Sequence, residues 1–369
     1  MDAPKSRGRV ADGRPDIRTP VTLLTGFLGS GKTTLLNRAL RDASLARSVV
    51  IINEFGEIGL DHALVTNSSD TITLLQNGCL CCTVFGDLIG TLNQLYYQRQ
   101  AGELPPFDRV LIETSGLADP RPVLQAFLSD PTLEGLYRVA GVITVVDAVN
   151  AATTLEAHPE FQRQVALADH VLITKRDLLA PDRIAETSAR LCETLRSLNP
   201  AAELLFADQT TDAAAILRAE QALPSQDAAQ TGAWLNVTAY AAAEAEHPHR
   251  HRETIHSFCF VREQPIPREA LQLLLGALEQ NLGPALLRVK GLVNVLEQPA
   301  GPAVIQGAQH LLHNLSWLPA WPDADRRTRI VFIADGVERG ELEQMISLLD
   351  RVAMRTAAAR RSAAARLAG

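Results

Sequence analysis

The sequence lacks three features that would assign it to common functional classes. It has no excess of positive charge: 35 lysines and arginines stand against 42 acidic residues, and a net charge of −7 gives a field that repels nucleic acid. It has no uninterrupted apolar run of the roughly 18 residues that cross a bilayer. Its first 20 residues contain no apolar stretch of the kind found in secretory signals. We therefore expect a cytoplasmic protein with no nucleic-acid partner and no membrane partner.

Cysteine is also scarce, since the chain has only five. Three of them, Cys79, Cys81 and Cys82, fall within the short sequence CLCC. An odd total, a reducing compartment and thiols too close for ordinary disulfide geometry argue against a disulfide framework. Because 46% of its 369 residues are apolar, the chain can build at least one sizeable core without cross-links. Metal or redox chemistry is the remaining use for the cluster.

The first part of the chain has the pattern of an α/β domain. Residues 1–19 are rich in Arg, Asp, Gly and Pro, which predicts a flexible leader. Residues 20–235 alternate short Val/Ile/Leu runs with longer helix-compatible stretches, which is typical of a mostly parallel sheet covered by helices. The predicted strands are Val21–Thr25, Val49–Asn53, Thr71–Leu75, Arg109–Glu113, Val142–Asp147 and Val171–Thr174.

The pattern changes after residue 235. A linker is predicted over 236–252, where His247, His249 and His251 are equally compatible with metal binding and with simple solvated sequence. Residues 253–350 favour a small C-terminal α+β domain with an antiparallel sheet. Residues 351–369 are a basic stretch rich in Ala and Arg, which is compatible with a frayed helix or with a tail. The predicted elements of this domain are strands Ile255–Val261, Leu286–Val295, Val304–Gly307 and Ile330–Ala334 and helices Arg268–Gln280 and Glu338–Ala353.

The first predicted strand runs directly into GFLGSGKTT at residues 26–34, which fits the phosphate-binding loop (P-loop) pattern G-x-x-x-x-G-K-[ST]. A helix-compatible stretch follows, so strand, loop and helix occur in the order that the motif requires. The glycines let backbone N–H groups face phosphate oxygens, Lys32 brings a positive charge to the outer phosphates, and the Thr33 hydroxyl can ligate Mg²⁺. The nucleotide-binding residues predicted from this motif are Gly26, Gly29, Ser30, Gly31, Lys32, Thr33 and Thr34.

The base is predicted from the strand at 171–174, which leads into Thr174-Lys175-Arg176-Asp177 and resembles the [NT]-K-x-D guanine reader of GTPases. The Asp177 carboxylate can accept hydrogen bonds from both the ring N–H and the exocyclic amine of guanine, and adenine does not present that donor pair on the same edge. Thr174 replaces the commoner Asn, and a solvated charged turn is the alternative interpretation. Because the tetrapeptide follows a late strand of a P-loop domain, we expect GTP rather than ATP.

Two acidic segments also follow predicted strands. Glu113 ends an apolar strand and could hold Mg²⁺ through water, while Gly116 lets a backbone N–H face the terminal phosphate. Glu54 and Glu57, in NEFGE, offer carboxylates near the magnesium and the attacking water. Ordinary acidic turns are the alternative interpretation. The candidate catalytic residues are Lys32, Glu54 and Glu113.

The cysteine cluster lies in NGCLCC at 77–82, where Asn-Gly forms a turn on which thiols can converge. A helix N-terminus and a bound cation both favour thiolate, the form that binds metal. Sulfur ligands select Zn²⁺ or Cu(I) over Mg²⁺, with Co²⁺ also compatible, and three thiolates leave a fourth tetrahedral position open for transfer to a partner. Buried structural cysteines and a redox switch are the alternatives. Cys192 and Cys259 lie alone and are predicted core residues.

Taken in order, the P-loop, NEFGEIGLD, NGCLCC, ETSGLADP and TKRD resemble the CobW-type GTPases, the cobalamin-synthesis-protein and zinc-chaperone family. The likeness continues through RVKGL at 288–292, a tryptophan at 317 or 321 and RIVFIADG, so it covers residues 20–350. The resemblance implies a weak GTPase whose three clustered cysteines hold a transition metal, most simply zinc. It also implies that the metal is loaded with GTP and Mg²⁺ bound and passed to a client metalloenzyme upon hydrolysis.

Two other functions remain open at this point. The chain could insert cobalt or iron for cobalamin synthesis or for a nitrile-hydratase-type enzyme. It could instead be a zinc store or thiol sensor that is regulated by nucleotide. The C-terminal domain is compatible with binding a client or with association into a homo-oligomer, and no residue in it identifies a partner.

Overall fold

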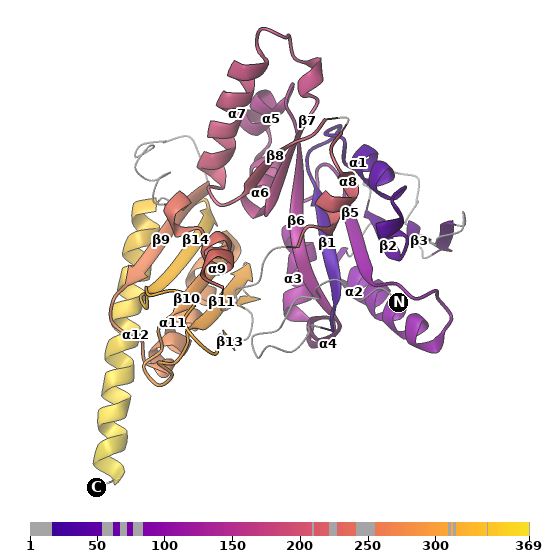
Figure 1. The fold of residues 1–369 in the computed structure, drawn as a ribbon. Helices are drawn as coiled ribbons and strands as arrows, with labels where there is room; N and C mark the ends of the chain where they lie inside the picture. Colours follow the sequence, from indigo (N-terminus) through magenta and orange to yellow (C-terminus); the bar gives the residue numbers. More distant parts are fainter. Residues whose placement is uncertain are drawn as a thin grey trace. The chain divides into compact units, whose positions relative to one another are not determined.

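The computed structural model describes residues 17–53, 62–66, 72–76, 84–208, 210–220, 227–240, 255–308, 311–312, 315–337 and 339–368. These residues form two compact units, the first within 17–220 and the second from residue 227 onward (Figure 1). Helix α9 (Ala228–Leu235), which the sequence pattern assigns to the first domain, groups with the second unit. Across the described residues, no helix combines the length and the apolar composition that a bilayer crossing requires.

The first unit is built on an eight-stranded sheet with the order β4-β3-β2-β5-β1-β6-β7-β8 (Figure 1). The strands from β2 to β8 in this order are parallel, whereas β3 and β4 pair antiparallel at one edge. The predicted mostly parallel sheet is therefore confirmed. The strands are β1 (Thr19–Thr25), β2 (Ser48–Asn53), β3 (His62–Thr66), β4 (Ile72–Gln76), β5 (Arg109–Thr114), β6 (Tyr137–Asp147), β7 (His170–Thr174) and β8 (Glu203–Phe206).

Two of these strands, β3 and β8, are absent from the sequence prediction. Each holds only two large aliphatic residues, whereas the predicted five-residue strands β4 and β7 hold three, so the apolar signal of β3 and β8 is weaker. The predicted strand at 71–75 forms β4, at the antiparallel edge. Because β3 runs against β2 and β4 runs against β3, β4 runs in the same direction as β2. The carboxyl end of β4 therefore lies at the same edge of the sheet as the loop after β1.

Helices cover this sheet. One face is covered by α1 and α8, and Leu36, Val50, Leu172 and Leu217 belong to a single buried cluster there. Asp130 begins α4 and Asp212 begins α8 by accepting hydrogen bonds from backbone N–H groups of the first turn. The helices are α1 (Lys32–Ala39), α2 (Val84–Ala101), α3 (Arg121–Ser129), α4 (Pro131–Leu136), α5 (Ala151–Ala157), α6 (Pro159–Leu167), α7 (Ile184–Leu198) and α8 (Ala213–Arg218), with short 3-10 turns at Ala43–Leu45 and Arg176–Leu178.

The second unit has a six-stranded antiparallel sheet with the order β12-β11-β10-β14-β9, in which β13 also pairs with β11. The predicted small antiparallel domain is confirmed. Leu274, Val289, Phe332 and Ile346 belong to one core that joins α11, the sheet and α12. The elements are β9 (Ile255–Arg262), α11 (Arg268–Leu282), a 3-10 turn (Gly283–Ala285), β10 (Leu286–Val293), β11 (Ala303–Ala308), β12 (Leu311–Leu312), β13 (Ser316–Trp317), β14 (Thr328–Asp335) and α12 (Arg339–Ala368).

Helix α12 is longer than the sequence pattern indicates. The predicted helix ends at Ala353, but α12 continues to Ala368. It therefore runs through the stretch that the composition suggests is a basic tail.

Candidate nucleotide site

The P-loop folds around a buried lysine. β1 ends at Thr25 and α1 begins at Lys32, whose side chain donates to the carbonyl oxygens of Gly26 at 2.8 Å and Phe27 at 3.2 Å. Lys32 is only 7% exposed, so its charge lies at the centre of the loop. Gly26 has φ +135°, and a Cβ there would lie 2.3 Å from the Val145 carbonyl oxygen. Glycine is thus required where the loop crosses β6.

The two residues predicted to hold magnesium meet in the structure. The Thr33 hydroxyl in the first turn of α1 donates to Glu113 Oε1 at 2.6 Å. Glu113 is 2% exposed and lies on β5, where it is paired with Leu24 of β1. The pairing of β1 with β5 therefore brings together two oxygen ligands that are 80 residues apart in sequence. A hydroxyl beside a carboxylate is a donor set suited to a hard cation such as Mg²⁺.

Gly116 lies against the P-loop. A Cβ on Gly116 would lie 2.5 Å from Leu28 N and 2.7 Å from Leu28 Cα, so a larger residue could not occupy this position without displacing the loop. The Gly116 carbonyl accepts a hydrogen bond from the Gln164 side chain of α6. The structure thus places the predicted phosphate-facing glycine next to the loop that carries Lys32.

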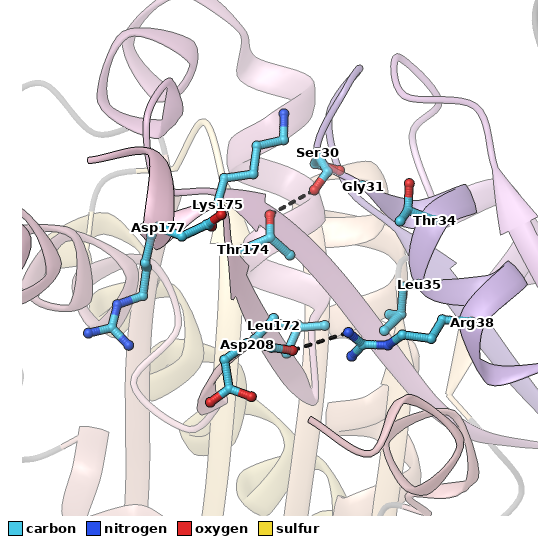
Figure 2. A pocket seen from close by; sticks show the side chains of 12 residues that line it. Ser30, Gly31, Thr34, Leu35, Arg38, Leu172, Thr174, Lys175, Asp177 and Asp208 are labelled. Atoms are coloured by element: carbon cyan, nitrogen blue, oxygen red, sulfur yellow. Dashed lines mark hydrogen bonds between the residues drawn. The ribbon is translucent and has the colours of Figure 1, made fainter. Parts of the chain in front are cut away.

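The predicted guanine reader is tied to the P-loop by Thr174. The Thr174 hydroxyl lies 2.8 Å from the Ser30 carbonyl and 3.2 Å from the Val146 carbonyl, and Figure 2 shows the bond to Ser30. Threonine at this position therefore makes a definite contact although it replaces the commoner Asn. Lys175 follows with a left-handed backbone, φ 60°, and its side chain donates to Asp147 Oδ2 at 2.9 Å.

Asp147 is a site residue that the sequence analysis missed. It ends β6 and is brought next to Lys175 because Asp147 pairs with Thr174 across β6 and β7. Burial raises the pKa of Asp147, but hydrogen bonds from Lys175, Asn150 and the Val149 N–H outweigh burial and leave that pKa below its ordinary value. The carboxylate is therefore charged at neutral pH. The detectable signal in the sequence is an acidic residue at the carboxyl end of a predicted apolar strand.

A cavity of about 460 Å³ opens beside these residues, and its volume is in the range of small-molecule sites (Figure 2). Ser30, Gly31 and Thr34 line it from the P-loop side, and Thr174 and Asp177 line it from the β7 side. The cavity therefore joins the predicted phosphate residues to the predicted base reader.

Arg38 closes this cavity on a side that the sequence analysis did not predict. It comes from α1 and donates to the carbonyl oxygen of Asp208 at 3.1 Å, as Figure 2 shows, and to that of Thr211 at 2.9 Å. The segment after β8 is thereby held against α1. The contacts of Arg38 depend on strand order, so only the tertiary structure could reveal them.

The remaining predicted site residues lie outside the described residues. They are Glu54, Glu57, Cys79, Cys81, Cys82, His247, His249 and His251. Within the described part of the chain, no group of three or more His, Cys, Asp or Glu residues could hold a metal ion. Cys192 is buried in α7, and burial raises the pKa of its thiol, which disfavours the metal-binding thiolate. Cys259 is half-buried on β9.

Comparison with known families gives two matches that together cover most of the chain. Residues 20–206 match the family described as CobW/HypB/UreG, nucleotide-binding domain. Residues 255–349 match the cobalamin synthesis protein cobW C-terminal domain. The two matched segments correspond to the two sheets.

Individual proteins show the same similarity. The zinc chaperone YjiA of Escherichia coli K12 is 31% identical over 324 residues, which cover 88% of this chain and 95% of YjiA. The zinc chaperone CobW of Pseudomonas aeruginosa is 39% identical over 209 residues, 48% of this chain and 54% of that protein. The crystal structure of Zn(II)-bound YjiA GTPase from E. coli matches with a TM-score of 0.63 at 26% identity, covering 90% of this chain and 99% of that one.

Proposed function

Because the chain belongs to the CobW/HypB/UreG family of nucleotide-binding proteins, we propose that it is a GTP-hydrolysing metallochaperone that carries zinc on Cys79, Cys81 and Cys82 and passes it to a client metalloprotein. The observation that carries the nucleotide part is the 2.6 Å hydrogen bond between Thr33 and Glu113 beside the buried Lys32. This arrangement supports the binding of a magnesium nucleotide. The proposal places the protein in the cytoplasm, where thiols stay reduced.

Each described residue of the site has a role in this proposal. Lys32 neutralises the outer phosphates, and the Gly116 N–H faces the terminal phosphate. Thr33 and Glu113 would hold Mg²⁺, which would supply positive charge to the phosphate oxygens when bound. Asp177 reads the guanine edge, while Thr174 and Lys175 fix the base-reading turn against the P-loop and Asp147. Glu54 is proposed to orient the attacking water.

Zinc is the cargo in this proposal. Three clustered thiolates suit Zn²⁺ and leave one coordination position for a ligand of the client. The segment that carries them follows β4, whose carboxyl end shares an edge with the P-loop and lies four strand positions from β1, a separation of about 19 Å. The terminal phosphate of GTP can order the segments that carry Glu54 and Gly116, and hydrolysis can release them. This ordering and release is a physical route by which GTP could change the zinc affinity of the cysteine cluster.

A zinc-bound mutant of YjiA shows which control a zinc titration of the present protein needs. A crystal structure described as a Zn(II)-bound triple mutant of YjiA GTPase, with one glutamate and two cysteines replaced by alanine, matches this chain with a TM-score of 0.65 at 25% identity, covering 90% of this chain and 99% of that one. Zinc was therefore bound by YjiA in the absence of those two cysteines. A zinc titration of the present protein must accordingly separate its tightest site from weaker ones.

The proposal is tested by measuring the zinc affinity of the full chain by competition with a chromophoric chelator. We expect affinity at least about tenfold tighter with a non-hydrolysable GTP analogue and Mg²⁺ than with GDP and Mg²⁺, a typical allosteric coupling. Replacing Cys79, Cys81 and Cys82 by Ser should remove the tight site and leave GTP binding unchanged. Equal zinc affinities in the two nucleotide states would refute the coupling.

The chain offers a matched control for the cysteine variant. The double variant Cys192→Ser and Cys259→Ser also removes thiols, but from positions on α7 and β9. It should keep the tight zinc site. The same titration with Co²⁺ separates the zinc proposal from the cobalt alternative, since we expect Zn²⁺ to displace Co²⁺ from a thiolate site. A tight site that binds cobalt in preference would favour the alternative.

A further inference from the structure

Helix α6 makes side-chain contacts both to the P-loop and to the segment 115–119. Phe27 of the loop lies 4.5 Å from the His158 ring at the start of α6 and 5.8 Å from the Phe161 ring, both measured between ring centroids. Gln164, one turn further along, donates through Nε2 to the carbonyl oxygens of Gly116 at 3.2 Å and Ala118 at 3.0 Å. The helix therefore connects the phosphate loop to the segment expected to sense the terminal phosphate.

Gln164 is completely buried, with no exposed surface. Its two carbonyl partners can be served only by the NH₂ group of the amide, which fixes the orientation of the side chain. The backbone of the helix is also held at this residue, because the Thr144 hydroxyl of β6 donates to the backbone carbonyl oxygen of Gln164 at 2.6 Å. A buried amide costs free energy unless it is hydrogen-bonded, so Gln164 is a specific polar placement in an otherwise apolar helix face.

These bonds restrain the backbone of Gly116. Since a peptide unit is planar, holding the Gly116 carbonyl fixes the plane between Gly116 and Leu117. Leu28 packs against the Cα of the residue, at distances that leave no room for a Cβ. The Gly116 N–H belongs to the preceding peptide unit, so the bond from Gln164 acts on it only through the φ and ψ angles of Gly116, in which glycine has the most freedom. The contact with Leu28 limits that freedom.

The Gln164 side chain also has unused bonding capacity. Its Oε1 atom is buried and accepts no hydrogen bond from the described residues. A buried acceptor without a donor is unfavourable, and a backbone N–H brought to it by movement of a neighbouring segment would be stabilised. The Gln164 amide therefore makes two bonds to segment 115–119 and keeps one buried acceptor that no described group satisfies.

We propose that Gln164 is a positioning residue that holds segment 115–119 so that the Gly116 N–H meets the terminal phosphate, and that it thereby sets the preference of the site for GTP over GDP. This role rests on the proposed GTPase function. Gln164 touches neither the nucleotide nor the metal ion in the proposal. It acts through the two carbonyl groups that it holds.

The test uses Gln164→Met, which keeps the length and flexibility of the side chain but removes both hydrogen bonds. Affinities for a non-hydrolysable GTP analogue and for GDP, each with Mg²⁺, are measured by calorimetry on the full chain. We expect affinity for the analogue to fall about tenfold, as for one or two lost hydrogen bonds, with affinity for GDP unchanged and the rate constant of GTP hydrolysis lowered. A general structural defect would instead weaken both nucleotides together.

Gln162→Met is the matched control. Gln162 lies on the same helix and donates to the Leu155 carbonyl of α5 at 2.6 Å, so its replacement removes a similar bond away from segment 115–119. Its GTP-to-GDP affinity ratio should match that of the wild type. If Gln164→Met keeps the wild-type ratio, or lowers both affinities equally, the role of Gln164 is overturned while the proposed function stands. If the wild type itself does not bind GTP, both are overturned.

Hydrogen exchange of the wild-type protein provides a test that needs no stable variant. Amides of segment 115–119 and of α6 should gain protection together when the GTP analogue replaces GDP. Protection gained by segment 115–119 without any change in α6 would overturn the proposal.

Discussion

The two sheets of this protein bury polar side chains in different ways. In the first unit, seven of the 14 buried polar residues among those described gather at the carboxyl ends of parallel strands and in the loops that follow them: Thr25, Ser30, Lys32, Glu113, Thr114, Ser115 and Asp147. In the second unit the buried polar residues are dispersed among its elements: Thr231, Lys290, Thr328 and Asp350. Thr328, for example, accepts from the Asn294 N–H, and Asp350 pairs with Arg262. Since every buried polar group must recover its cost of desolvation, convergence marks a site and dispersal marks structure.

The largest expected difference concerns two equally buried lysines. Lys32 is 7% exposed and Lys290 is 6% exposed. Lys32→Met should weaken binding of the magnesium GTP analogue by at least about 100-fold, because charged hydrogen bonds to phosphate are lost. Lys290→Met should leave that affinity unchanged, since Lys290 contacts the Trp234 carbonyl and ring in the second unit. Calorimetric titration measures both, and a nucleotide defect in Lys290→Met would break the comparison.

The next largest expected difference is in how glycine-to-alanine substitutions in the two units change the free energy of unfolding. Gly26→Ala places a Cβ 2.3 Å from the Val145 carbonyl oxygen at a residue with φ +135°, so we expect a loss of about 2 kcal/mol in the free energy of unfolding. Gly276→Ala, in α11, meets no atom within 4 Å and should stabilise by about 0.5 kcal/mol. Urea denaturation measures both changes. If Gly26→Ala left the free energy of unfolding unchanged, the P-loop could move away from β6.

The smallest expected difference is in the response to acid. The depressed pKa of Asp147 stabilises the folded state above its ordinary pKa, and this contribution is lost as the pH falls through the folded pKa, below about pH 4. The pKa of Asp350 is shifted upward, because burial outweighs the attraction of Arg262. Its contribution is present below the ordinary pKa and is lost as the pH rises through the folded pKa.

The two variants Asp147→Asn and Asp350→Asn should therefore change the slope of stability against pH in opposite directions. Asp147→Asn should reduce the rise of stability with pH near pH 4, and Asp350→Asn should increase it, each by less than about 1 kcal/mol across the window. Urea midpoints between pH 3 and 6 provide the measurement. Slopes that change in the same direction would contradict the assignment of these two carboxylates.

Within the first unit, the site residues that the sequence could predict are those identified by local sequence order alone. Lys32, Thr33 and their glycines lie in one continuous segment, so local order was enough to identify them. Glu113 was predicted from its place at a strand end, and the structure adds that it meets Thr33. The contacts of Asp147, Arg38 and Gln164 needed the strand order, because their partners are brought to them by β7, β8 and β5 respectively.

The other errors concern elements whose own sequence pattern is weak. β3 and β8 are held by the strands beside them rather than by their own pattern, and α12 has few large apolar residues beyond Met354 to indicate its length. The predicted roles of Glu54, Cys79, Cys81 and Cys82 stay predictions, because these residues lie outside the described part of the chain.

The length of α12 has a practical consequence. Its 30 residues give an axis of about 45 Å, whereas the eight-residue strands β9 and β14 span about 27 Å. Among the residues of α12 whose burial is described, the buried ones are Ile346, Asp350 and Ala353, in the first half of the helix. The helix is thus about 18 Å longer than these strands, and a fluorophore or an affinity handle attached in its last turns should leave the core of the second unit intact.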